Sequence, residues 1–179
     1  MRKSFGRSLA LSFLLAGSLH LSASHPASAM EAEFGDFQRI MLMPLQAQVK
    51  RADAILNRKY KKDFNPATYE SNMENSIPFY ALASDATFAA YRIAAARPEL
   101  LAGYEVYESC RGGVPRTLLE CFFRGGARGE YVDLAASCPV CSAEAVTLFL
   151  WDEAGVPSSQ FTGGLRFLYD PSLREPPPL

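Results

Sequence analysis

The chain has 179 residues, of which 49% are hydrophobic and 21% are charged, and its formal net charge at pH 7 is −1. This length suits a single domain with its own hydrophobic core. The near-neutral charge argues against nucleic acid as the main partner.

Residues 1–29 have the order of a secretory signal peptide. Arg2, Lys3 and Arg7 form a positive start, a short apolar run follows over residues 9–21, and a motif of small residues ends at Ala29. This order predicts cleavage after Ala29. We therefore expect an exported protein, either periplasmic or extracellular.

Cleavage would change the chemistry that is open to the mature chain. Both histidines, His20 and His25, lie in the predicted signal peptide, so the mature chain would contain none. That excludes histidine bases, histidine metal ligands and Ser-His-Asp catalysis. The leader also carries three basic and no acidic residues, which leaves 15 basic and 19 acidic residues and a formal charge of −4. No later apolar run approaches the roughly 18 residues of a membrane helix, so no transmembrane segment is expected in the mature chain.

The first part of the mature chain carries helical signals. Apolar residues recur every three or four positions over residues 31–63, and Pro44 interrupts this pattern. A second helical stretch follows, with Ser84 or Asp85 as its N-cap. Residues 98–103 suggest one more short turn, with proline at its start and glycine at its end.

The second part of the mature chain has the composition of strands. Five segments are rich in β-branched and aromatic residues: 104–110, 118–124, 130–134, 145–151 and 161–169. The sequence therefore predicts an α+β domain over residues 30–170, with N-terminal helices followed by an antiparallel sheet of about four or five strands. Residues 171–179 form a proline-rich tail.

Four cysteines remain after the predicted cleavage, Cys110, Cys121, Cys138 and Cys141. In an oxidising compartment an even number predicts disulfides, here two, which would stabilise the domain. A turn at residues 114–117 would place Cys110 opposite Cys121 and leave Cys138 with Cys141. Pairing of Cys110 with Cys141 and of Cys121 with Cys138 stays open. A four-cysteine zinc site is disfavoured, because the chain has a single Cys-x-x-Cys motif and oxidation would remove the thiolates. No metal or other cofactor is expected.

Cys138-Pro-Val-Cys141 is also a candidate redox pair. In thiol–disulfide oxidoreductases the first cysteine of such a motif lies at a helix N-terminus, which favours the thiolate. Residues 142–155 could form that helix. Two observations weigh against this interpretation. The 38 residues after Cys141 are too few for the rest of a thioredoxin-type domain, and residues 145–151 have better strand than helix composition.

A cluster of basic residues lies on the first predicted helix, around Tyr60: Lys50, Arg51, Arg58, Lys59, Lys61 and Lys62. It could contact an anionic partner, such as a lipid headgroup or an acidic protein face. A solvated helix face explains the same pattern and is the favoured interpretation.

Six carboxylates are candidate acid–base groups: Glu105, Glu108, Glu120, Asp133, Asp152 and Glu153. A pair of them could hydrolyse glycosides without histidine, but nothing in their spacing brings two to one cleft. We therefore expect an exported, non-catalytic accessory module that binds another exported or envelope protein, such as an envelope-assembly accessory or an inhibitor or immunity-type protein. Thiol–disulfide exchange by Cys138 and Cys141 is the alternative, and a carboxylate hydrolase is the third.

Overall fold

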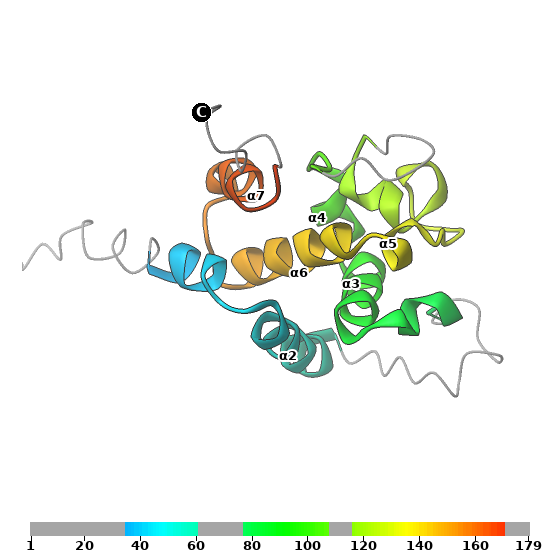
Figure 1. The fold of residues 1–179 in the computed structure, drawn as a ribbon, viewed down its shortest axis with the longest axis horizontal. Helices are drawn as coiled ribbons and strands as arrows, with labels where there is room; N and C mark the ends of the chain where they lie inside the picture. Colours follow the sequence, from blue (N-terminus) through cyan, green and yellow to red (C-terminus); the bar gives the residue numbers. More distant parts are fainter. Residues whose placement is uncertain (1–34, 61–76, 108–115, 171–179) are drawn as a thin grey trace, which may run out of the picture.

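The computed structural model describes residues 35–60, 77–107 and 116–170, and these form helices joined by turns (Figure 1). Residues 35–41 make a first helical segment. The α-helices that follow are α2 (Leu45–Ile55), α3 (Asp85–Ala96), α4 (Pro98–Ala102), α5 (Leu134–Ser137), α6 (Pro139–Glu153) and α7 (Phe161–Tyr169). A π-helical turn, η1 (Leu56–Tyr60), extends α2. Four short 3-10 turns complete the described chain: η3 (Phe79–Ala83), η4 (Leu118–Cys121), η5 (Arg124–Gly126) and η6 (Ser158–Gln160).

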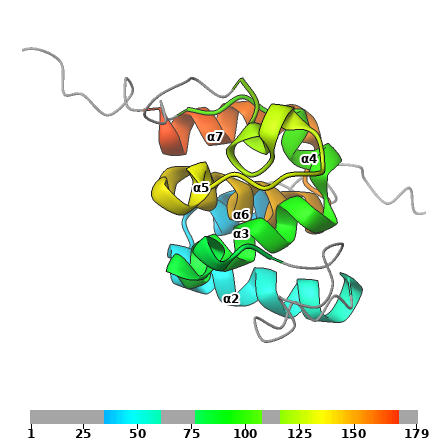
Figure 2. The same cartoon turned by 90° about the vertical axis from the view of Figure 1, so that its right-hand side faces the viewer.

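Helix α6 is the centre of the molecule. It packs against α2, α3, α4, α5, α7 and η4. Figures 1 and 2 show α2 on one side of it and α7 on the opposite side. All eleven residues over 141–151 are buried. A helix that is covered on every side needs no polar stripe. The three polar side chains of this stretch, Ser142, Glu144 and Thr147, are buried together with its apolar ones.

The predicted antiparallel sheet is wrong. The described residues contain no sheet, and their one pairing of this kind is an isolated antiparallel bridge between Phe123 and Tyr131. Residues 145–151 lie inside α6, residues 161–169 form α7, and the segment after residue 117 begins with the η4 turn. β-branched and aromatic composition indicates burial as much as strand structure, and the surrounding helices decide the outcome here.

The helices predicted for the first part of the chain are confirmed where the structure describes them. Pro44 separates the 35–41 segment from α2. The Ser84 side chain accepts a hydrogen bond of 3.1 Å from the Thr87 amide and so caps α3. Helix α4 begins at Pro98 and is capped by Gly103.

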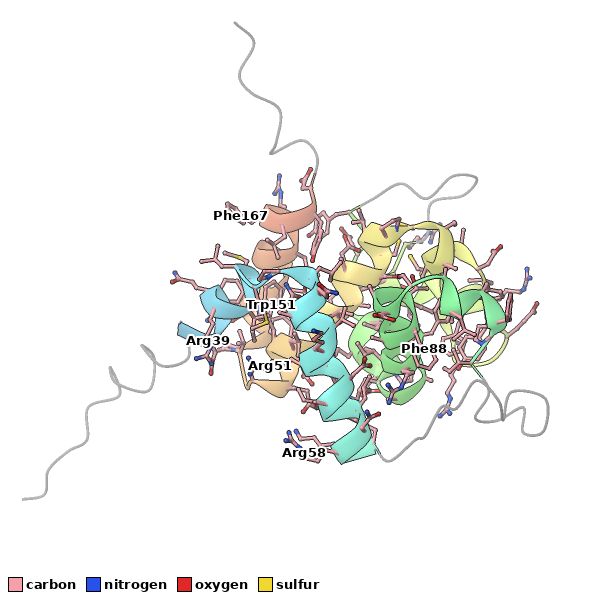
Figure 3. The ribbon with its side chains drawn as sticks, turned by 60° about the horizontal axis from the view of Figure 1, so that its bottom comes forward. Arg39, Arg51, Arg58, Phe88, Trp151 and Phe167 are labelled. Atoms are coloured by element: carbon pink, nitrogen blue, oxygen red, sulfur yellow. The ribbon has the colours of Figure 1, made fainter. Side chains whose placement is uncertain are left out.

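Helix α7 approaches α6 closely at Gly164. A Cβ atom on this residue would lie 2.5 Å from the Trp151 ring and 2.7 Å from the Phe37 ring. Gly164 is therefore required for close packing of the two helices. The Trp151 ring, labelled in Figure 3, stacks on Phe37 and Phe161, and the ring centroids are 4.8 Å and 5.7 Å away.

No helix in the three described ranges is both long and apolar enough to cross a membrane. The predicted signal peptide and the proline-rich tail lie outside the described residues, as do Cys110, Glu108, Lys61 and Lys62.

Candidate functional site

Three cysteine sulfurs meet at the N-terminal end of α6. The Sγ atoms of Cys138 and Cys141 are 2.8 Å apart, and the Sγ atoms of Cys141 and Cys121 are 3.3 Å apart. Cys121 and Cys141 are fully buried, whereas the exposed fraction of Cys138 is 7%. We call these three residues the thiol cluster. Cys141 is its central member, because it contacts both of the others.

Local sequence sets the geometry of Cys138 and Cys141. Cys138 is the N-cap of α6, and Pro139 occupies the first helical turn, where its missing amide proton removes no helical hydrogen bond. The Cys141 amide donates a hydrogen bond of 3.3 Å to the Cys138 Sγ. The helix dipole favours negative charge at this position, which is where reactive cysteines of Cys-x-x-Cys motifs lie.

Cys121 reaches the cluster from the η4 turn. The Leu118 amide donates to the Tyr104 carbonyl at 2.8 Å, and the Phe123 amide donates to the Leu119 carbonyl at 3.0 Å. After the turn, the Val132 amide donates to the Phe122 carbonyl at 2.9 Å. These backbone bonds fix the turn on both sides of Cys121.

The two predicted disulfides are not supported. A disulfide needs a sulfur–sulfur distance of about 2.05 Å, and no two of the three described sulfurs lie at that distance. The proposed pairing of Cys110 with Cys121 relied on a hairpin, but Cys121 ends a helical turn. Cys110 itself is outside the described residues. The prediction that disulfides stabilise the domain is therefore wrong for the described cysteines.

Among the described residues, no group of three or more His, Cys, Asp or Glu side chains has the arrangement of a metal site. The sulfur distances give a physical reason. Tetrahedral zinc with Zn–S bonds of about 2.3 Å would hold its sulfurs roughly 3.8 Å apart. The separations of 2.8 Å and 3.3 Å suit sulfurs that react with one another better than sulfurs that surround an ion.

Aromatic side chains pack beside η4 and α5. Tyr91 contacts Phe122 edge-on, with ring centroids 5.0 Å apart, and its hydroxyl donates to the Val132 carbonyl at 2.5 Å. Burial raises the pKa of Tyr91, and burial also raises the pKa of Tyr131 to about 12. Both phenols are therefore neutral across the physiological pH range.

Two of the predicted carboxylates, Asp152 and Glu153, lie at the opposite end of α6 in a network of charged groups. The Arg97 guanidinium donates to the Asp152 carboxylate at 2.6 Å and to the Tyr60 hydroxyl at 3.2 Å. The Tyr60 hydroxyl donates to Glu153 at 2.8 Å, and Lys59 forms an ion pair with the same carboxylate. Burial alone would lower the pKa of Arg97, but hydrogen bonds to Glu99, Tyr60 and Asp152 outweigh it and raise that pKa. Each charged group of this network is paired with another group of the network, so we assign the network a structural role.

The other described carboxylates are dispersed. Glu120 accepts the Arg116 amide at 2.8 Å. Asp133 lines one described pocket and Glu105 lines another, and each of these two pockets has that carboxylate alone. Neither therefore presents the carboxylate pair that a glycosidase requires.

The predicted basic cluster is divided between two elements. Lys50 and Arg51 are on α2, and Arg58 and Lys59 are on η1. Figure 3 labels Arg51 and Arg58 along this helix. Lys59 is paired with Glu153. Contact with an anionic partner stays a prediction.

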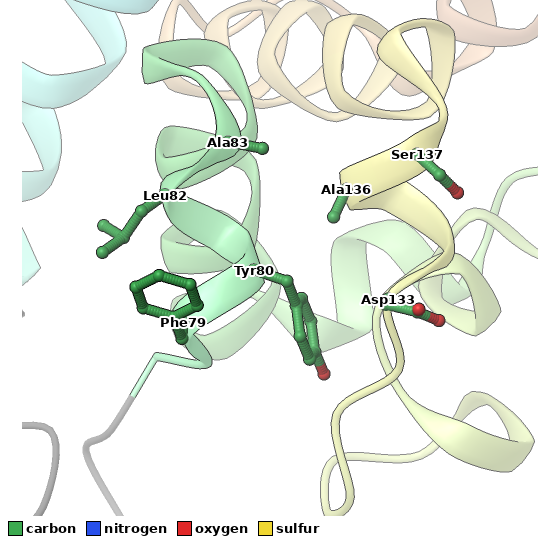
Figure 4. A pocket seen from close by; sticks show the side chains of 7 residues that line it. All are labelled: Phe79, Tyr80, Leu82, Ala83, Asp133, Ala136 and Ser137. Carbon is green, nitrogen blue, oxygen red and sulfur yellow. The ribbon is translucent and has the colours of Figure 1, made fainter.

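An open pocket of about 370 Å³ lies between η3 and the segment that leads into α6 (Figure 4). Phe79, Tyr80, Leu82 and Ala83 line it from η3, and Asp133, Ala136 and Ser137 line it from the other side. Ser137 immediately precedes Cys138, so this mostly apolar pocket adjoins the start of α6 in the chain.

The sequence named Cys121 as a disulfide cysteine but did not predict its contact with Cys141, and it did not single out Glu144. Cys121 joins the thiol cluster only through tertiary packing, for which its local sequence has no signal. Glu144 is fully buried in α6 and accepts the Tyr107 amide at 3.2 Å. Its position inside an apolar segment was the one available cue, because a carboxylate there requires a partner.

Comparisons with protein-family models, curated proteins and solved structures returned no match.

Proposed function

We propose that this protein carries out thiol–disulfide exchange with exported polypeptides, using Cys138 and Cys141. One observation carries the proposal: the two sulfurs are 2.8 Å apart at the N-terminus of α6, with Cys138 at the N-cap. Thiolate character and access decide which cysteine reacts. Both favour Cys138, since it is the more exposed of the two and accepts the Cys141 amide.

The reaction needs a substrate that contains a disulfide, which acts as the oxidant. The Cys138 thiolate, having lost its proton to water, attacks one substrate sulfur, and a mixed disulfide forms as the first substrate thiolate leaves. The Cys141 thiol then loses its proton and attacks the Cys138 sulfur. The mixed disulfide breaks and the second substrate thiolate leaves. The protein loses two electrons in forming a bond between Cys138 and Cys141, and the substrate disulfide is reduced to two thiols.

The predicted leader supports this function, because disulfide-containing substrates are found in oxidising compartments. The helical architecture gives the reaction a setting different from a thioredoxin-type domain, since the described residues contain no sheet. This proposal replaces the fold-stabilising disulfides of the initial prediction with thiols that form a disulfide only as a product of turnover.

Reduction of insulin by dithiothreitol, followed by turbidity, tests the proposal. We expect the purified protein to accelerate the reaction and Cys138→Ser to return the rate to that of dithiothreitol alone. Cys141→Ser should instead accumulate a mixed disulfide between the protein and the substrate. Serine is a good N-cap, so Cys138→Ser removes the thiol while it keeps the cap. Far-ultraviolet circular dichroism confirms that each variant is folded. Full activity in folded Cys138→Ser would refute the proposal.

Binding of another exported protein without catalysis is a second candidate. It is favoured by two apolar side chains at the η3 pocket, Phe79 and Leu82, whose exposed fractions are 76% and 42%. Crosslinking in the native compartment tests it, with Phe79→Ser compared with Phe167→Ser. Phe167 is 63% exposed but belongs to α7. A partner that is lost in Phe79→Ser alone supports this candidate, and equal crosslinking in both variants argues against it.

A further inference from the structure

We infer that Cys121 is a third thiol of the exchange reaction, which takes over the disulfide from Cys138. This inference rests on the proposed function. Cys141 contacts both other sulfurs, Cys138 at 2.8 Å and Cys121 at 3.3 Å. Cys141 can therefore form its bond with either neighbour without a change of fold.

The chemistry of the step is an exchange inside the cluster. After substrate has been reduced, Cys138 and Cys141 share a disulfide. The Cys121 thiolate attacks the Cys141 sulfur, a bond forms between these two, and the bond from Cys141 to Cys138 breaks. Cys138 leaves and takes up the proton that Cys121 releases, so that it becomes a thiol again. No electrons are gained or lost overall.

The position of α6 gives this step its direction. A thiol with a lower pKa leaves faster in disulfide exchange. Cys138 is the member of the cluster at the helix N-cap, where the amides stabilise a departing thiolate. Attack on Cys141 expels this favoured leaving group.

The burial of Cys121 and Cys141 determines where the new disulfide lies. Cys121 and Cys141 are both fully buried, so a disulfide between them is enclosed by protein, whereas Cys138 retains some exposure. The oxidised protein would hold its disulfide inside and present a thiol again at the outer position. Such a protein can form a mixed disulfide with a second substrate while it is still oxidised.

Disulfide mapping tests the inference. The purified full chain is oxidised with glutathione disulfide, its remaining thiols are blocked with N-ethylmaleimide, and a tryptic digest is analysed without reduction. Cleavage after Arg124 and Arg128 separates the Cys121 peptide from the one that carries Cys138 and Cys141. We expect a crosslink between these peptides, with the maleimide on Cys138. A disulfide within the second peptide and a labelled Cys121 would overturn the inference, as would a crosslink to Cys110.

Variants separate this inference from the proposed function. Cys138→Ser should neither reduce insulin nor form the bond between Cys121 and Cys141 with glutathione disulfide, because both of these sulfurs are fully buried and Cys138 is the point of entry. Cys121→Ala should stop with the disulfide between Cys138 and Cys141. Insulin reduction by wild type with no Cys121 crosslink would remove the inference and leave the proposed function standing. No insulin reduction at all would remove the proposed function. Cys121→Ser provides a second variant if alanine impairs folding.

Discussion

The two ends of α6 handle polar groups in opposite ways. At the N-terminal end, Cys138 and Cys141 lie sulfur to sulfur, with an amide of the helix donating to the first. At the C-terminal end, Asp152 and Glu153 face the cation of Arg97 at 2.6 Å and 3.8 Å. One end brings together groups that can react with each other, and the other brings together groups that neutralise each other.

The helix dipole accounts for the difference. Negative charge is favoured at a helix N-terminus and disfavoured at a C-terminus. A thiolate at Cys138 therefore gains from its position, whereas carboxylates at residues 152 and 153 need external cations. Arg97 and Lys59 supply them. The carboxylates at the C-terminal end are therefore held in ion pairs that stabilise the fold, whereas the cysteines at the N-terminal end are the groups that can react.

The largest expected effect concerns the aromatic packing at the C-terminal end. Trp151 is fully buried, stacks on Phe37 and Phe161, and donates its indole N–H to the Phe37 carbonyl at 3.2 Å. Trp151→Ala should lower the free energy of unfolding by about 3–5 kcal/mol, measured by urea denaturation. Phe167→Ala is the control, because this exposed ring should cost less than about 1 kcal/mol. Similar losses in both variants would contradict the packing described here.

The ionic network at the same end gives the next effect. Arg97→Met keeps much of the side-chain volume but leaves Asp152 and Glu153 without this cation. We expect a loss of about 2 kcal/mol in the free energy of unfolding, because hydrogen bonds to partly buried charged groups are lost. Arg124→Met is the matched control. Its pair with Glu130 is exposed on both sides, so its removal should cost far less than the removal of Arg97. Equal losses would show that the network is no more than a surface feature.

The sequence was sufficient for the helices of the first part of the chain but not for α6 and α7. Residues 45–60 show one apolar face, and Ser84 and Pro98 mark helix starts with local chemistry. Helix α6 has no polar face, because neighbours cover it on every side. Its Val, Thr, Phe and Trp content then resembles a buried strand. The alternative of a helix over residues 142–155 was the correct one, and length favours it, because the uninterrupted run from Pro139 to Gly155 is too long for an ordinary buried strand.

The thiol cluster was half predictable. The Cys-Pro-Val-Cys spacing identified Cys138 and Cys141, and cysteine followed by proline is compatible with a helix start. For Cys121 the sequence predicts a disulfide with Cys110 across a hairpin or, as the alternative, with Cys138, whereas the residue ends a helical turn and contacts Cys141. Its true contact with Cys141 spans 20 residues and depends on how η4 packs on α6. No local pattern encodes that contact.

A smaller effect concerns the aromatic surroundings of η4 and depends on pH. Burial raises the pKa of Tyr131 to about 12, compared with about 10 in the unfolded chain. The neutral phenol is favoured in the folded state, so this contribution is complete below pH 10 and is lost as pH rises toward 12. At pH 11 it should amount to a loss of about 1 kcal/mol. Urea denaturation of wild type and Tyr131→Phe between pH 8 and 11 checks this, and parallel curves would show that Tyr131 does not contribute.

The smallest effect separates the cap of α6 from its chemistry. Cys138→Ala removes the sulfur that accepts the Cys141 amide, and we expect a loss of about 0.5 kcal/mol in the free energy of unfolding. Cys138→Ser should retain the stability of wild type, because serine is itself a preferred N-cap. Both variants should nevertheless lack insulin reduction. If Cys138→Ser lost as much stability as Cys138→Ala, the loss of insulin reduction in both variants would be explained by damage to the fold. Cys138 would then have a structural role, and the two ends of α6 would not differ in function.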